Sequence, residues 1–391
     1  MLKLKSMDKL SPARSNIFLF KDFSQAALHL QGELCAKSVL ITGRRLYSIL
    51  NLPALTALAE PQPCPIILRG SGEKLKSFGC VETVIKEALE FGLGRNDTII
   101  AAGGGNLTDL GAFCASIYKR GARLILIPTT LLAMIDAAVG GKTAVNLGGF
   151  KNCAGTFYPA DEIIICPEFL RTLPVKEIEN GLFEALKYGV LFSKTMLDEI
   201  FENQRLLKKY RAQNGFGKRE AAVQAANSPI FFGIIKKCVE FKTRIVKKDP
   251  FDKNERLALN FGHTFGHAFE SVSGGAIPHG AAVGLGMAVE LIFAKHKYGG
   301  CEDRDKITAK LINFIRRCSH YAALDELLNT PGIFRRMRKF ISNDKKASTD
   351  GHIEMPIVKK AGLYKIEKIS LHEELEPFLN SPGRILNAWR E

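Results

Sequence analysis

The sequence contains no C-x-x-C pair, and its nine cysteines are scattered from Cys35 to Cys318. An odd and dispersed set of cysteines argues against a disulfide framework and favours reduced thiols in a cytosolic protein. No apolar run is long enough to span a bilayer, and the first residues lack the apolar core of a signal peptide. We therefore expect a cytoplasmic protein without a membrane partner.

Signatures of nucleic-acid binding are also missing. The formal net charge is +15, but the positive residues are spread along the chain, with local clusters at 208–219 and 335–346. No zinc-finger, RNA-recognition or basic-zipper pattern accompanies them. A basic surface, or a site for an anionic small molecule, explains this charge better than a nucleic-acid groove.

What the first part of the chain does contain is an alternation of short apolar runs and helical patterns. Strands are predicted at 38–42, 65–69, 97–101, 123–128 and 162–166. Helical spacing lies between them at 81–91 and 106–118. This alternation is typical of a mostly parallel sheet with helices on both faces.

Long helical patterns dominate after Pro174. Helices are predicted at 175–192, 230–246, 281–297 and 305–318, and a small hairpin at 353–358 and 363–369. The polar segment 208–226 is predicted to be a loop or an exposed insertion. The chain is therefore predicted to be an α/β protein, with a mostly parallel nucleotide-binding α/β domain at 1–173 and a helical metal-binding domain at 174–391.

A glycine-rich turn, Gly103-Gly104-Gly105, follows one predicted strand and opens a helix. Glycines at this position let backbone N–H groups approach a phosphate, and the helix N-terminus favours negative charge. The spacing is not the G-x-G-x-x-G of a Rossmann fingerprint. A dinucleotide pyrophosphate would suit the turn, and a simple tight turn is the alternative.

A second group of anion-binding candidates follows the strand at 123–128. Two glycines precede Lys142, and Lys151 and Asn152 come shortly afterwards. The Gly-Gly-Lys-Thr segment is similar to the end of a P-loop, but the first glycine of that motif would fall at Asp136, which excludes it. The cluster suits a phosphomonoester or a carboxylate, and a basic surface loop is the alternative.

A third group combines histidines with a carboxylate. His263 and His267 are four residues apart, so they share a helical face, and His279 follows a glycine-rich turn. Glu184 and Lys187 are three apart on another predicted helix. One glutamate and two or three histidines could hold a divalent metal with an open coordination position. The alternative is a helix with two hydrogen-bonded histidines and a surface glutamate.

Further polar residues extend the histidine stripe toward the N-terminus. Arg256 and Asn260 fall seven and three residues before His263. One continuous helix would place both on the face of the histidines. Since buried charges need partners, such a stripe is difficult to bury without a ligand.

Taken together, these segments resemble the 3-dehydroquinate synthase family of sugar-phosphate cyclases. The resemblance extends from about Ser38 to Ile369. Its motifs occur in order as GGGNLTDL, YKRG, PTTLLAMID, GGKTAVN, FKN, TLP, NGLFEALKYG, EFK, NERLALNFGHTFGHAFE, PHG and NDKK. The family fold implied is a nucleotide-binding α/β domain followed by a helical metal domain.

The resemblance also implies roles for individual residues. The metal ligands, for Zn²⁺ or Co²⁺, would be Glu184, His263 and His279, with His267 facing the substrate instead. The implied NAD contacts are Glu73, Lys76, Gly103, Gly104, Gly105, Asn106, Asp109, Thr129, Thr130, Lys142, Lys151 and Thr172. The implied substrate and catalytic contacts are Asp136, Lys142, Lys151, Asn152, Lys187, Lys242, Arg256, Asn260 and His267. Arg120 would reach the site of a neighbouring subunit, which implies a homodimer, and Lys345 or Lys346 would complete the phosphate site.

The reaction implied is the conversion of 3-deoxy-D-arabino-heptulosonate 7-phosphate to 3-dehydroquinate in the shikimate pathway. It would proceed by transient oxidation with bound NAD⁺, β-elimination of phosphate, return of the hydride and aldol cyclisation. The alternatives are a sister cyclase for another sugar phosphate, a metal-dependent alcohol or glycerol dehydrogenase, and a regulator that binds NAD without turnover.

Two positions depart from the family pattern in a way that bears on function. Gly43, followed by two arginines, stands where an acid usually binds the adenosine ribose, so NADP becomes an alternative cofactor. Ala281 stands where a glutamate usually follows the histidine-glycine pair. A carboxylate that would support His279 is therefore missing from its expected place.

Overall fold

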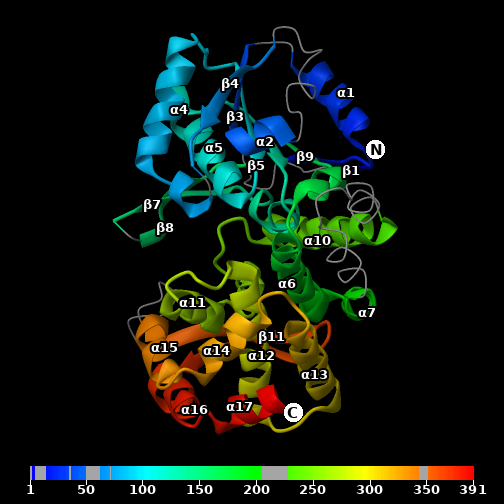
Figure 1. Ribbon diagram of the computed structural model, residues 1–391, viewed down its shortest axis with the longest axis vertical. Helices are drawn as coiled ribbons and strands as arrows, with labels where there is room; N and C mark the ends of the chain where they lie inside the picture. The colour runs from blue at the N-terminus through cyan, green and yellow to red at the C-terminus, as the bar shows by residue number, and fades with distance from the viewer. Residues whose placement is uncertain are drawn as a thin grey trace. The chain divides into compact units, whose positions relative to one another are not determined.

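The protein is described by a computed structural model. The described residues are 2–4, 15–34, 37–49, 62–70, 72–148, 150–204, 228–342 and 351–391. The chain divides into two compact units, Met1–Pro174 with Ala212–Phe251 and Val175–Arg211 with Asp252–Glu391 (Figure 1). The segment 212–251, which the helical pattern placed in the second domain, clusters with the first unit. The predicted insertion at 208–226 lies outside the described residues.

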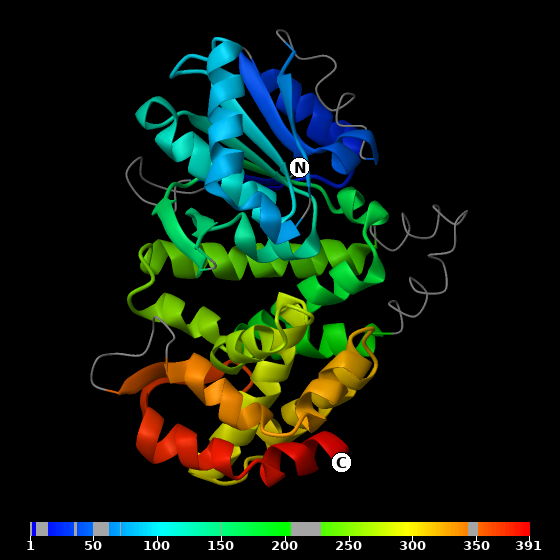
Figure 2. The same cartoon turned by 60° about the vertical axis from the view of Figure 1, so that its left-hand side comes forward.

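A seven-stranded sheet forms the centre of the first unit, with helices on both of its faces (Figure 2). Its order is β1-β2-β9-β6-β5-β3-β4, and β1 alone runs antiparallel to its neighbour. The strands are β1 (Leu2–Leu4), β2 (Asn16–Leu19), β3 (Ser38–Gly43), β4 (Cys64–Leu68), β5 (Thr98–Gly103), β6 (Arg123–Pro128) and β9 (Glu162–Ile165). Every residue of β3, β5 and β9 is buried, because both faces of a parallel sheet are covered. The predicted α/β fold is confirmed.

The helices of the first unit begin at recognisable caps. Ser77 caps α4 by accepting a hydrogen bond from Cys80 N, whereas Gly104 starts α5 without a side-chain cap. The helices are α1 (Phe23–Glu33), α2 (Arg44–Ile49), α4 (Phe78–Glu90), α5 (Gly105–Ile117) and α10 (Pro229–Lys248). Short helical turns are η1 (Gly72–Leu75), η2 (Tyr118–Arg120), η3 (Ala133–Ala137) and η4 (Pro167–Thr172).

An antiparallel hairpin in the first unit was not predicted. It joins β7 (Lys142–Leu147) to β8 (Phe150–Phe157), and most of the described residues of β8 are exposed. An exposed hairpin needs no continuous apolar run, so its sequence lacks the signal that identified the central strands. The hairpin carries two of the predicted anion-binding lysines.

The second unit is built mainly from helices, with one hairpin. The helices are α6 (Val175–Phe192), α7 (Lys194–Glu202), α11 (His263–Val272), α12 (His279–Tyr298), α13 (Glu302–Arg316), α14 (Tyr321–Asn329), α15 (Ile333–Ser342), α16 (Glu376–Asn380) and α17 (Gly383–Arg390). The turns η5 (Glu255–Asn260) and η6 (Leu371–Leu375) complete them. The hairpin β10 (His352–Lys360) and β11 (Leu363–Ser370) lies where the sequence predicted it. Most of α6 and α12 is buried, which explains their apolar sequences.

The prediction of one continuous helix through Arg256 and His267 is wrong. The 3₁₀ turn η5 ends at Asn260, and α11 begins only at His263. Gly262 lies between them with a φ of 81°, a left-handed conformation that glycine adopts at no steric cost. The histidines still share a helical face, but the arginine and the asparagine reach the site from a separate turn.

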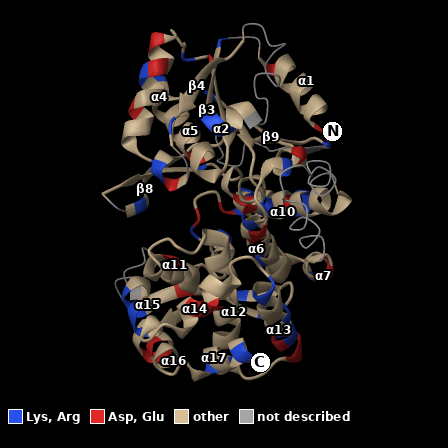
Figure 3. Ribbon diagram, in the orientation of Figure 1, with Lys and Arg blue, Asp and Glu red and all other residues tan. Residues whose placement is uncertain are grey.

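Charge is distributed over both units and is not confined to one groove. Lys and Arg occur on many elements, including the outward side of α15 (Figure 3). In the described part of the chain, no helix has both the length and the apolar character needed to cross a membrane.

Candidate functional site

The second unit gathers one carboxylate and two imidazoles at a single point. Glu184 comes from α6, His263 is the first residue of α11, and His279 is the first residue of α12. One ligand atom from each lies within 4.8 Å of the others. Glu184 is completely buried and His263 is 8% exposed. Three separate helices thus bring together the residues that the sequence proposed as metal ligands.

The spacing of these ligand atoms suits a small divalent ion. Glu184 Oε1 lies 3.5 Å from His263 Nε2 and 3.4 Å from His279 Nε2. In a tetrahedral site with bonds of about 2.0–2.1 Å, neighbouring ligand atoms are separated by about 3.3–3.5 Å. The residues present therefore fit a zinc-type ion with one position left for a substrate oxygen.

Each histidine of this cluster presents Nε2 to Glu184 because its other nitrogen faces an oxygen. His263 Nδ1 lies 3.2 Å from the carbonyl oxygen of Phe261, and His279 Nδ1 lies 3.3 Å from Glu270 Oε2. A proton on Nδ1 leaves the Nε2 lone pair available to a metal. Burial lowers the pKa of His279, but hydrogen bonds to Glu184 and Glu270 outweigh this effect and raise it to about 9.

Lys187 approaches the same carboxylate from one turn along α6. Its Nζ lies 2.5 Å from Glu184 Oε2, and both side chains are almost fully buried. The ammonium contacts the oxygen that faces away from the histidines, so the two carboxylate oxygens have different partners. Lys187 can therefore hold Glu184 in place while Oε1 remains directed at the imidazoles.

A second group with possible metal ligands occurs in the described part of the first unit. His29, Glu33 and Glu162 place ligand atoms within 4.8 Å of one another. Arg123 Nη2 already lies 2.7 Å from Glu33 Oε2 and 2.8 Å from Glu162 Oε1. Because Arg123 pairs with both carboxylates and His29 Nε2 lies 2.9 Å from Glu162 Oε2, we interpret this group as an ion-pair network.

His267 lies beside the proposed metal ligands without belonging to the cluster. Its ring centroid is 5.3 Å from that of His263 and 5.8 Å from that of His279. Arg256 is buried in η5, and Asn260 Nδ2 is a buried donor without a hydrogen-bond partner among the described residues. Their polar groups are donors suited to an anionic or hydroxylated ligand.

In the first unit, Lys76 contacts two other predicted site residues, Asp109 and Asn152. It is 3% exposed, and its Nζ lies 2.7 Å from Asp109 Oδ2 and donates a second hydrogen bond to Asn152 Oδ1. Burial raises the pKa of Asp109, and the Lys76 ammonium opposes that rise. Lys76, which directly follows η1, thus connects α5 to β8.

Glu73 is held next to this pair by two asparagines. Asn146 Nδ2 donates to Glu73 Oε1 at 2.7 Å. With its amide turned to satisfy both groups, Asn106 donates to Glu73 Oε2 at 3.0 Å and accepts from Glu73 N at 3.1 Å. Asn146 was missed as a candidate, although it is the last residue of the GGKTAVN segment. Its amide also accepts from Asn152 N at 2.8 Å, so it connects η1 to the hairpin.

The glycine turn lies directly before α5, as predicted. Gly103 ends β5, Gly104 precedes the helix and Gly105 is its first residue. The carbonyl of Gly103 accepts a hydrogen bond from Thr129 N at 2.8 Å. Thr129 Oγ1 is buried and makes no hydrogen bond with another described residue. The uncapped N-terminus of α5 and this hydroxyl are donors that a phosphate can use.

Two further candidates in the first unit form a tight pair. Lys242 of α10 donates from Nζ to the carbonyl oxygen of Asp136 at 2.6 Å and also contacts the Asp136 carboxylate. Lys242 is 6% exposed. This contact shows why α10 clusters with the first unit despite its later position in the chain.

The remaining candidates lie in more open positions. Lys142 is exposed on β7, and Lys151 is exposed on β8. Arg120 is exposed with a φ of 67°, and Thr172 is half-buried at the end of η4. Thr130 Oγ1 accepts a hydrogen bond from Ala133 N at 3.2 Å. Lys345 and Lys346 lie outside the described residues.

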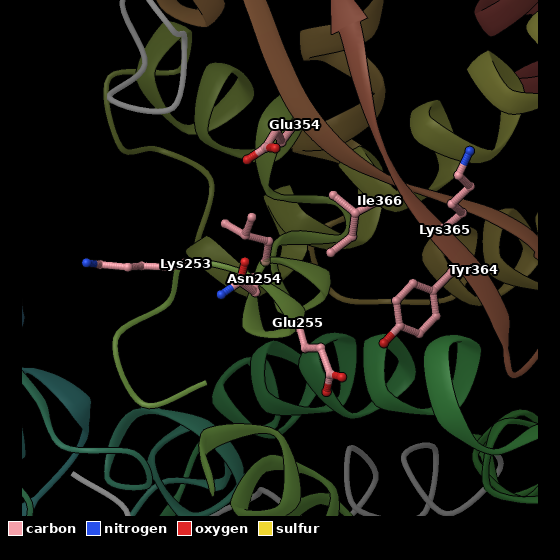
Figure 4. A pocket seen from close by; sticks show the side chains of 8 residues that line it. Lys253, Asn254, Glu255, Glu354, Tyr364, Lys365 and Ile366 are labelled. Carbon is pink, nitrogen blue, oxygen red and sulfur yellow. The ribbon is translucent and has the colours of Figure 1, made fainter. Parts of the chain in front are cut away.

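A separate hollow of about 360 Å³ occurs in the second unit (Figure 4). It is lined by residues of the 253–257 segment and by Glu354, Tyr364, Lys365 and Ile366. Burial and the nearby Glu255 carboxylate raise the pKa of Tyr364. The lining shares no residue with the cluster of Glu184, His263 and His279.

Comparisons with known proteins agree with this geometry. The family models for the 3-dehydroquinate synthase N-terminal and C-terminal domains match residues 66–180 and 181–347. The 3-dehydroquinate synthase of Pyrococcus furiosus is 40% identical over 278 residues, which cover 71% of this chain and 76% of that protein. The 3-dehydroquinate synthase of Chlamydia caviae is 43% identical over 227 residues, which cover 56% of this chain and 54% of that protein.

A solved structure shows the same fold at lower identity. It is the 2-epi-5-epi-valiolone synthase of Streptomyces hygroscopicus subsp. jinggangensis with NAD⁺ and Zn²⁺ bound. The TM-score is 0.78 at 23% identity, and the alignment covers 100% of this chain and 99% of that chain. At this identity the similarity establishes the fold and leaves the substrate open.

Proposed function

The chain belongs to the 3-dehydroquinate synthase family, and we propose that it converts 3-deoxy-D-arabino-heptulosonate 7-phosphate to 3-dehydroquinate and phosphate. The observation that carries this proposal is the cluster of Glu184, His263 and His279, whose ligand atoms lie within 4.8 Å of one another. The family models span both units, and relatives named 3-dehydroquinate synthase cover most of the chain. The enzyme is thus a phosphate-eliminating lyase of the shikimate pathway.

The cofactors of the proposed reaction are NAD⁺ and a divalent metal, Zn²⁺ or Co²⁺. Glu184, His263 and His279 would hold the metal, as their ligand-atom spacing supports. When bound, the metal would polarise a substrate hydroxyl and NAD⁺ would accept and return its hydride. Lys187 would keep Glu184 oriented, since its Nζ lies 2.5 Å from Glu184 Oε2.

In the first unit, we assign the end of β5 to the dinucleotide. The backbone N–H groups of Gly104 and Gly105 would face the pyrophosphate, with Thr129 Oγ1 as a further donor. Glu73, fixed by Asn106 and Asn146, would contact a ribose of the cofactor. Arg44 and Arg45 are exposed directly after Gly43, so NADP remains the alternative.

Charged side chains would hold the substrate. The substrate carries a carboxylate and a phosphate, and the proposed contacts offer matching cations. Lys242 and Arg256 suit the carboxylate, whereas Lys142, Lys151 and Asn152 suit the phosphate. Asn260 and His267 would position the hydroxyl groups next to the metal, so that little motion is needed between the steps.

A homodimer is part of the proposal. Lys119 and Arg120 adopt consecutive left-handed conformations, with φ of 46° and 67°. Two such residues in succession hold an exposed arginine in one direction at a cost in backbone strain. Arg120 is exposed, so its side chain is available for the role in a second copy's site that the family resemblance implies.

The experiment that tests the function measures two signals in one cuvette. Purified protein receives 3-deoxy-D-arabino-heptulosonate 7-phosphate, catalytic NAD⁺ and Zn²⁺ or Co²⁺. Phosphate release without net NADH, with 3-dehydroquinate as product, is the expected result. Net NADH would identify a dehydrogenase. Phosphate release only from another sugar phosphate, such as sedoheptulose 7-phosphate, would identify a sister cyclase, and NAD binding without any turnover would identify a regulator.

Replacing Lys142 with alanine is expected to weaken binding of the substrate far more than binding of the cofactor. Loss of one charge-assisted hydrogen bond to phosphate would raise KM roughly 10- to 100-fold. The Kd of NAD⁺, measured by fluorescence titration, should rise by a far smaller factor than the KM of the substrate. Lys86→Ala is the matched control, because Lys86 is exposed on α4 with only a 3.9 Å ion pair to Glu90. Equal losses of affinity for the substrate and for NAD⁺ would contradict the assignment of Lys142 to the substrate site.

A further inference from the structure

Glu270 lies on the face of α11 that carries the proposed metal ligand. It follows His263 by seven residues, or two helical turns, so both side chains point to the same side of the helix. The chain then turns at Gly274 and Gly275, which have φ of 62° and 81°. This turn returns the chain so that His279, at the start of α12, meets Glu270.

Glu270 and Glu184 contact opposite nitrogens of the same imidazole. Glu270 Oε2 lies 3.3 Å from His279 Nδ1, and Glu184 Oε1 lies 3.4 Å from Nε2. The ring of His279 is therefore held between Glu184, which would share the metal, and Glu270, which contacts the opposite nitrogen. Only one-third of the His279 side chain is exposed, and Glu270 is more buried still.

The family pattern led us to expect a carboxylate beside His279 at position 281, where this chain has alanine. Ala281 is completely buried in α12 and contributes no polar group. Glu270 supplies a carboxylate from the neighbouring helix instead. The other imidazole of the cluster has a neutral partner, because His263 Nδ1 faces the backbone carbonyl of Phe261. Thus each metal-facing histidine has an acceptor behind it, and that of His279 is charged.

We propose that Glu270 is a positioning residue that orients His279 and sets the affinity of the site for its divalent metal. The proposal rests on the metal binding assumed in the proposed function. An acceptor on Nδ1 keeps the proton there, leaves the Nε2 lone pair for the metal and makes the imidazole a stronger ligand. A carboxylate does this more effectively than a neutral amide, because its charge stabilises the partly positive ring.

The test measures metal binding directly, in the full-length protein without substrate. Zn²⁺ affinity is determined by competition with a chromophoric chelator for the wild type, Glu270→Gln and Glu270→Ala. Loss of such a hydrogen-bond partner typically weakens metal binding 10- to 100-fold, so we expect about 100-fold for alanine and about 10-fold for the isosteric glutamine. The visible spectrum of the Co²⁺ form should also change, because the orientation of one ligand changes.

A purely structural role makes a different prediction. If Glu270 only tied α11 to α12, Glu270→Gln would keep the tie through its amide oxygen, and its Zn²⁺ affinity and Co²⁺ spectrum would match the wild type. That result, or unchanged affinity in Glu270→Ala, would overturn the proposal while the proposed function stands. Glu374→Gln, which removes a carboxylate paired with Lys297 elsewhere in the same unit, is the control and should leave affinity unchanged.

The outcome also separates this proposal from the function on which it rests. Wild-type protein that binds neither Zn²⁺ nor Co²⁺, or a His263→Ala variant that binds them as tightly as the wild type, would overturn the metal site and the role of Glu270 with it. Metal binding that is present in the wild type, lost in His263→Ala and weakened in the two Glu270 variants would support both the metal site and the role of Glu270.

Discussion

His263→Ala should lose both the bound metal and turnover. His263 is one of three proposed metal ligands that come from three separate helices, and its Nε2 lies 3.5 Å from Glu184 Oε1. Since a bound metal supplies several kcal/mol of charge stabilisation in the transition state, we expect phosphate release to fall at least ~1000-fold. Metal content after dialysis, measured by atomic emission, and the rate of phosphate release provide the check.

His267→Ala is the matched control for this variant. It removes the same side chain from the same helix face, and its ring lies only 5.3 Å from that of His263. Because His267 is outside the ligand cluster, this variant should keep its metal and lose substrate affinity. Full activity in metal-free His263→Ala protein would contradict the metal assignment. Equal metal loss in the two variants would add His267 to the ligands.

Gly286→Ala should destabilise the second unit and disturb the metal cluster. A Cβ at residue 286 of α12 would lie 2.0 Å from the carbonyl oxygen of Gly262 and 2.7 Å from Gly266 N. These are backbone atoms at the start of α11, so the clash can be relieved only by separating the two helices. We expect a cost of about 3 kcal/mol, at the upper end for overpacking. His263 directly follows Gly262, so Zn²⁺ affinity should fall as well.

The single tryptophan of the chain makes this measurement specific to the second unit. Trp389 lies in α17, is 4% exposed and donates from Nε1 to Asp325 Oδ1 at 2.7 Å. Its fluorescence during urea unfolding should show a lower midpoint for Gly286→Ala. Gly383→Ala is the control, because a Cβ there meets no heavy atom of the described residues within 4 Å. An unchanged midpoint would show that α11 and α12 can separate without cost.

The central sheet could be predicted from the sequence because its signal is local. Strands buried on both faces must be continuously apolar, so β3, β5, β6 and β9 were found within one or two residues of their observed bounds. Strands β1 and β2 are only three and four residues long, and β8 is largely exposed, so their sequences give no comparable apolar signal and they were missed. Helix α6 was predicted with its observed bounds, because its buried stripe is long and regular.

The candidate ligands themselves were also readable from the chain. The motifs that surround Glu184, His263 and His279 identified them through resemblance, and the structure brings their ligand atoms together. Spacing alone favoured His263 and His267 as a pair. That interpretation left the set open, because residues four apart share a face whether or not both bind one ion.

The sequence by itself determined the fold class and the family and proposed the chemically active side chains, since these depend on local patterns and motifs. Only the tertiary structure decided which side chains meet. The left-handed conformation of Gly262, which separates η5 from α11, was likewise visible only in the structure. Three contacts join side chains from different elements: Lys242 with Asp136, Asn146 with Glu73 and Glu270 with His279. Such contacts depend on the path of the backbone in space, which no local pattern encodes.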